Sequence, residues 1–124
     1  MKRTIAALAF AAILSLPLPA ISHEMGHGKA ATITGEVVDT GCYLGHAARG
    51  ASHTDCALRC VRGGMPMAVL TPQGALYLVT MNHDNPDAFN KLKELAGKNV
   101  TVTGTLITRN GMKGIDVTAV KPAA

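Results

Sequence analysis

The sequence is short of aromatic residues, with no tryptophan, two phenylalanines and two tyrosines among 124 residues. Proteins that bind single-stranded nucleic acid stack bases on aromatic side chains and follow the phosphates with basic residues. The formal charge is only +4, and it falls to +2 if Lys2 and Arg3 are removed with the N-terminal segment. So few rings and so little positive charge argue against nucleic acid, and against an anionic membrane surface, as a partner.

Several motifs that mark enzymes are also missing. The chain has no nucleotide-binding glycine loop, no G-x-S-x-G, no H-E-x-x-H and no thioredoxin-like C-x-x-C. Asp39 and Glu36 have no spacing that pairs them for acid–base work. We therefore expect no enzyme, and a cysteine nucleophile is the enzymatic alternative that remains.

The sequence contains no run of ~20 apolar residues, which is the length that a helix needs to span a bilayer. The apolar stretch Ile5–Leu16 has 12 residues, follows the basic start Met1-Lys2-Arg3 and ends before Pro17. This pattern predicts a signal peptide over residues 1–22, cleaved after Ala20 or Ser22, with an uncleaved N-terminal anchor as the alternative. No cysteine follows closely, so no lipoprotein anchor is expected. The mature chain should be periplasmic or secreted, without stable membrane insertion.

Residues 23–30 show no apolar period and contain two glycines, which predicts a flexible tail. The tail carries His23, Met25 and His27, whose nitrogen and sulfur atoms are copper ligands, although a polar tail without metal is the simpler interpretation. Residues 31–124 are then enough for one small domain.

This domain is predicted to be mainly β. Alternating and β-branched runs predict strands over residues 32–40, 66–70, 75–81, 99–108 and 114–120. Turns are expected at residues 71–74 and at Asn110-Gly111. Helices are expected over residues 53–62, capped by Ser52, and from an Asn85 cap to Ala96. Gly35 inside the first strand predicts a bulge or bend, and the similar T-V-T-G-T-L around Gly104 indicates the same use of glycine.

Five strands with a helix between the third and fourth resemble the OB-fold, a five-stranded Greek-key β-barrel. The resemblance covers the order of elements over residues 31–121, and no signature motif carries it. It is to small exported bacterial OB-fold proteins rather than to the nucleic-acid binders. It implies a barrel with a Cys-rich helical insert between strands 1 and 2, and ligands that meet strands 2 and 3 and the loops after strands 1 and 4. A β-sandwich or an open α+β sheet is the runner-up.

The unusual residues lie between Cys42 and Cys60, where 19 residues contain all three cysteines and two of the five histidines. His53, Cys56 and Cys60 are three and four residues apart, which places them on one stripe of a helix. Cys42, at the end of the first strand, can fold over that stripe. This predicts a Cys3His site for zinc, which Cu(I) or an iron–sulfur cluster could also use.

Other residues near this stretch are secondary candidates. His46 could replace His53, and the thioethers of Met65 and Met67 favour Cu(I), unless they only fill the core. The helix N-terminus and the neighbouring arginines are expected to lower the thiol pKa values: Arg49, Arg59 and Arg62.

Two functions therefore remain open. The first is an exported protein that holds copper or zinc through Cys42, His53, Cys56 and Cys60, with another exported protein as a possible partner. The second follows from the odd number of cysteines in an oxidising compartment. Cys42 bonded to Cys56 or Cys60 would staple the insert to the barrel and leave one thiol free. The chain would then be a metal-free binding or interaction module.

Overall fold

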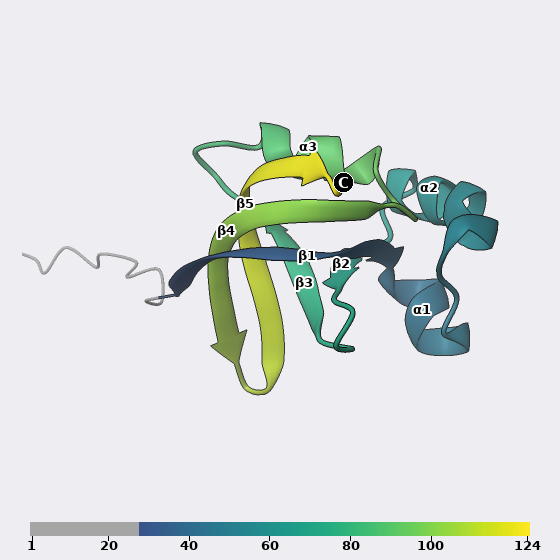
Figure 1. Ribbon diagram of the computed structural model, residues 1–124, viewed down its shortest axis with the longest axis horizontal. Helices are drawn as coiled ribbons and strands as arrows, with labels where there is room; N and C mark the ends of the chain where they lie inside the picture. Colours follow the sequence, from purple (N-terminus) through teal and green to yellow (C-terminus); the bar gives the residue numbers. More distant parts are fainter. Residues whose placement is uncertain (1–27) are drawn as a thin grey trace, which may run out of the picture.

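The computed structural model describes residues 28–124 (Figure 1). The predicted signal peptide and the tail residues His23, Met25 and His27 lie outside this part. Within it, no helix is long and apolar enough to cross a membrane. The elements, in chain order, are β1 (Lys29–Asp39), α1 (Thr40–His46), the short 3-10 helix η1 (Ala51–His53), α2 (Thr54–Arg62), β2 (Met67–Leu70), β3 (Leu76–Met81), α3 (Asp87–Lys93), β4 (Asn99–Arg109) and β5 (Met112–Pro122).

The five strands close into a barrel in the order β1-β2-β3-β5-β4, with β4 pairing back to β1. All neighbours are antiparallel except β3 and β5, which are parallel. The predicted mainly-β barrel with helices is therefore confirmed, and closure of the sheet contradicts the sandwich and open-sheet alternatives.

Two strand glycines allow close approach of the backbones. At Glu36, β1 passes from pairing with β4 to pairing with β2. There, a Cβ on Gly35 would lie 2.3 Å from the carbonyl oxygen of Leu70. On β4, a Cβ on Gly104 would lie 2.2 Å from the carbonyl oxygen of Asp116, next to a shift in register between β4 and β5. Both glycines thus lie where a carbonyl of a neighbouring strand leaves no room for a side chain, which is a shared use of glycine in strands.

The core fills the barrel and extends under the helices α2 and α3. Branched residues from the strands are completely buried there, and the two helices add smaller side chains and one leucine: Val37, Val69, Val100, Val102, Ile115, Ala57, Val61 and Leu92. Figure 1 places α1 and α2 together at the end of β1. Because α2 is anchored in the core, its cysteine-bearing part has a fixed position relative to β1.

The helix α1 was not predicted, since the residues after Cys42 were expected to form a loose loop. The helix begins because the Asp39 side chain accepts the N–H of Cys42 (2.8 Å), and it ends where Ala47 adopts a left-handed conformation with φ 55°. Cys42 therefore lies in the first turn of a helix and not at the end of a strand. No residue of α1 is buried, so the helix leaves no apolar pattern in the sequence.

The predicted helix caps were also wrong in detail. Ser52 lies in η1, and His53 precedes α2 without a side-chain cap. Pro86 occupies the cap position of α3, while the Asn82 side chain accepts the backbone N–H groups of Asp84 and Asn85 (3.0 Å each). The helix α3 also ends at Lys93, before the expected Ala96. Neither α2 nor α3 therefore has the side-chain cap that the sequence favoured.

Candidate metal centre

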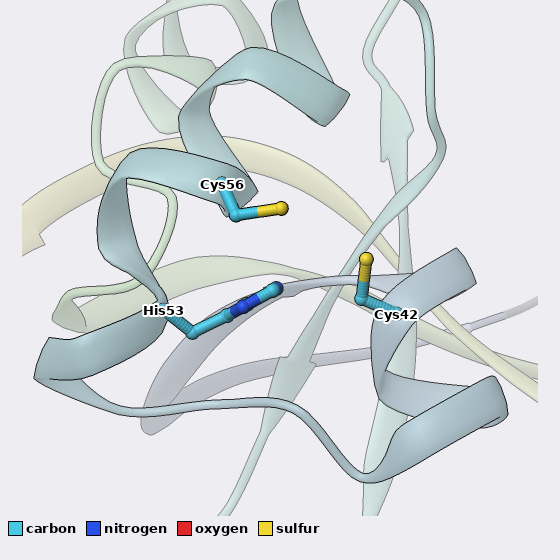
Figure 2. Close-up of side chains that lie close together, drawn as sticks. All are labelled: Cys42, His53 and Cys56. Atoms are coloured by element: carbon cyan, nitrogen blue, oxygen red, sulfur yellow. The ribbon is translucent and has the colours of Figure 1, made fainter.

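The three cysteines lie on two short helices that meet at the end of β1. Cys42 is in the first turn of α1, and Cys56 and Cys60 are one turn apart on α2. Figure 2 shows the Cys56 sulfur and the His53 ring extending toward Cys42. All three cysteines are partly buried, and none is joined to another in a disulfide.

Two sets of donor atoms overlap at Cys42. In the first set, one donor atom each of Cys42, His53 and Cys56 lie within 4.8 Å of one another. In the second set, the same limit holds for Asp39, Cys42 and Cys60. A tetrahedral zinc ion with Zn–S bonds of about 2.3 Å holds its sulfurs roughly 3.8 Å apart. Both sets therefore need only a small contraction to close around an ion.

The structure brings three of the four predicted ligands into one set and places the fourth beside it. Cys60 neighbours Cys42 and Asp39 rather than joining the set of His53 and Cys56. Cys42 is thus the residue that connects the two sets, although it comes from the helix that was not expected.

Asp39 is a member of the site that the sequence did not single out. Its side chain is completely buried; Oδ1 accepts the backbone N–H of Cys42, and Oδ2 lies 3.0 Å from Nε2 of His53. An ionised carboxylate only accepts hydrogen bonds, so Nε2 is the donor, and in a neutral ring Nδ1 is then the nitrogen with a lone pair for a metal ion. Metal-binding histidines are commonly oriented by such a carboxylate. The D-x-x-C spacing, which suits a helix cap, was the available signal.

The Asp39 carboxylate controls the electrostatics of the site. Burial raises its pKa, but hydrogen bonds from the Cys42 N–H and from His53 outweigh burial and hold the pKa below its usual value. The hydrogen bond from the Cys42 thiol to this carboxylate, together with burial and the negative charge, raises the pKa of Cys42 to about 12. Asp39 is therefore ionised while the thiol beside it is protonated.

The expectation that helix and arginine charges lower the thiol pKa values is wrong for Cys42 and Cys60. Burial and a hydrogen bond with Cys56 raise the pKa of Cys60. Arg62 instead pairs with Glu94, and the remaining two arginines are exposed: Arg49 and Arg59. A metal ion that binds here must displace protons from the thiols.

The secondary ligand candidates lie in different surroundings. His46 is exposed in the last turn of α1 and belongs to neither donor set. Met67 is 2% exposed and is part of the core, as the simpler interpretation held. Met65 is 38% exposed and packs against Gly41, the residue before Cys42.

No protein-family model matches the chain, and neither a curated protein nor a solved structure is detectably similar to it. Its function is therefore inferred from its own residues. A histidine oriented by a buried carboxylate and three neighbouring thiols could hold a metal ion.

Proposed function

We propose that this chain is an exported protein, similar to the small bacterial OB-fold proteins, that binds copper or zinc. Cys42, His53 and Cys56 are the primary ligands, and Cys60 completes the set. The metal is held for storage, delivery or local structure, and the partner in delivery is another exported protein. The basic and apolar N-terminal residues 1–22 support export.

The observation that carries this proposal is the hydrogen bond between Asp39 and His53. A buried carboxylate that fixes a histidine ring beside two cysteine thiols is the arrangement that metal sites use to orient a ligand. Thiolates and imidazole are donors that both zinc and copper accept.

The same geometry weighs against a thiol enzyme. A cysteine nucleophile reacts as its thiolate, and an effective one has a lowered pKa. The pKa of Cys42, by contrast, is raised to about 12 because its thiol bonds to Asp39. His53 therefore accompanies a thiol that is held in its unreactive form.

A disulfide-stapled module without metal is the competing proposal. It is favoured by the proximity of Cys42, on α1, to two sulfurs on the separate helix α2. Oxidation of Cys42 with either cysteine would cross-link the two helices and leave one thiol.

Elemental analysis and thiol counting decide between the two. The full-length chain is expressed with its own N-terminus, purified from the periplasm and analysed by mass spectrometry for metals. Binding predicts about one copper or zinc ion per chain and three free thiols after denaturation without reductant. Metal below roughly 0.2 per chain with intact thiols contradicts the proposal. One free thiol and a cross-linked peptide containing Cys42 establish the stapled module instead.

A further inference from the structure

The two methionines of the Met65-Pro66-Met67 segment lie in different surroundings. Met67 is 2% exposed and packs in the barrel core. Met65 is 38% exposed and is absent from that core. Core filling accounts for the thioether of Met67, but it does not account for the thioether of Met65.

The end of α2 ties Met65 to Cys60. Gly64 has φ 103°, its N–H binds the carbonyl of Val61 (3.1 Å), and the N–H of Met65 binds the carbonyl of Cys60 (2.9 Å). This is the Schellman pattern, with glycine in the left-handed position. The residue after that glycine commonly contacts the residue whose carbonyl it binds. The motif therefore places Met65 over the end of the helix that carries Cys60.

A second set of bonds ties the same segment to the chain before Cys42. The carbonyl of Pro66 accepts both the backbone N–H and the hydroxyl of Thr40, each at 2.9 Å. The side chain of Met65 lies directly on Gly41, where a Cβ would be 2.9 Å from its sulfur and 2.7 Å from its methyl group. The thioether thus lies beside the residue that precedes Cys42, at the end of the helix that carries Cys60.

We propose that Met65 is a ligand of the metal centre and that it selects Cu(I) over Zn(II). This inference rests on the proposed function. A thioether is a soft donor that binds Cu(I) well, whereas zinc sites use thiolate, imidazole and carboxylate. Methionine is flexible enough to turn its sulfur from Gly41 toward an ion held by the cysteines. Its exposure also makes this sulfur accessible to an ion that arrives from solvent.

The test compares Met65→Leu with Met67→Leu. Leucine keeps an apolar contact but removes the sulfur, and Met67→Leu is the matched control because its thioether is buried in the core. Affinities are measured by anaerobic competition with chelators, once for Cu(I) and once for Zn(II), after circular dichroism has verified folding. We expect Met65→Leu to weaken Cu(I) binding by about tenfold or more and to leave Zn(II) binding unchanged. Met67→Leu should change neither affinity.

Unchanged Cu(I) affinity in Met65→Leu overturns the inference. An equal loss of Cu(I) and Zn(II) affinity also overturns it, because that result indicates only a packing role on Gly41. If the wild type binds neither ion, the proposed function has failed, and this inference fails with it.

A direct readout uses selenomethionine-labelled protein loaded with Cu(I). X-ray absorption at the selenium edge should detect copper as a neighbour of selenium in the wild type and in Met67→Leu, but not in Met65→Leu. A wild type that holds Cu(I) without a copper neighbour at selenium shows that Met65 is not a ligand, while the metal site itself stands.

Discussion

At the scale of single residues, Cys42 has a larger expected effect than any other donor because it belongs to both donor sets. Cys42→Ser should therefore weaken metal binding by about 100-fold or more, whereas Cys56→Ser and Cys60→Ser each leave one set intact and should cost about tenfold. Competition titration measures these affinities. His46→Asn, on the same helix but outside both sets, is the control. Equal affinities for Cys42→Ser and His46→Asn would contradict the proposed centre.

A second prediction at this scale concerns the reactivity of the metal-free Cys42 thiol. The hydrogen bond to Asp39 is the largest cause of its pKa of about 12. Asp39→Asn keeps a residue that can cap α1 but removes the negative charge. We expect the variant to have a lower Cys42 pKa, so that iodoacetamide alkylates Cys42 faster at pH 8. Peptide mass spectrometry after timed alkylation measures the rate. Asp55→Asn, at an exposed position on α2, is the control, and its Cys42 should be alkylated at the wild-type rate. A wild-type rate of Cys42 alkylation in Asp39→Asn would contradict this account.

The same raised pKa predicts how stability depends on pH. The native state favours the protonated Cys42 thiol, so its stabilising contribution is complete below the ordinary value of 9.0 and is lost as pH rises toward about 12. The metal-free wild type should lose stability over this range, measured by urea unfolding under reducing conditions. Cys42→Ser should lose less over the same range. Parallel pH profiles for the two proteins would refute this assignment.

At the scale of elements, some glycines are required because a side chain would clash with a neighbouring strand, and others are not required. A Cβ at Gly35 would meet the carbonyl of Leu70, and backbone cannot move aside cheaply, whereas a Cβ at Gly45 in α1 meets nothing within 4 Å. We expect Gly35→Ala to lower the free energy of unfolding by about 1–3 kcal/mol or more. Gly45→Ala should raise it by roughly 0.5–1 kcal/mol, because alanine favours helix. Urea unfolding followed by circular dichroism suits a chain without tryptophan. Similar values for both variants would show that β1 tolerates a side chain at Gly35.

The sequence predicted those elements in which a pattern of apolar residues marks the buried face. The strands alternate β-branched residues around a core, and the predicted helix that carries Cys56 and Cys60 is present because Ala57 and Val61 anchor it. His53 lies just before this helix, and Cys60 falls outside the donor set of His53 and Cys56. The helix α1 was missed because a buried aspartate caps it and no apolar stripe marks it. The effect of Asp39 on the pKa of Cys42 was missed for the same reason.

Contacts between distant residues explain the remaining errors. Arg62 was expected to act on the thiols, but its partner Glu94 lies 32 residues later in the chain. Likewise, Met65 and Met67 look equivalent in the sequence. Their exposure differs because Met65 follows the end of α2 and is partly exposed, whereas Met67 begins β2 and is buried.

At the scale of the whole molecule, the insert between β1 and β2 is joined to the barrel at its two ends, where Asp39 pairs with Met67 and Thr40 bonds to Pro66. In between, α1 buries no residue, so it should open more easily than the barrel when metal is absent. A metal ion that bridges Cys42 on α1 and Cys56 on α2 would oppose this opening.

Limited trypsin digestion can measure this effect, because exposed arginines occur both in the insert and in the barrel strands. Arg49 follows α1, and Arg109 lies at the end of β4 beside the hairpin turn. Without metal, cleavage after Arg49 should precede cleavage after Arg109. Metal should slow cleavage after Arg49 in proportion to its saturation of the site, and it should leave Arg109 little affected. Equal slowing at both sites would mean that the ion stabilises the barrel globally without bridging the helices. No slowing at Arg49 would mean that α1 does not contribute a ligand, and Cys42 would then have no place in the centre.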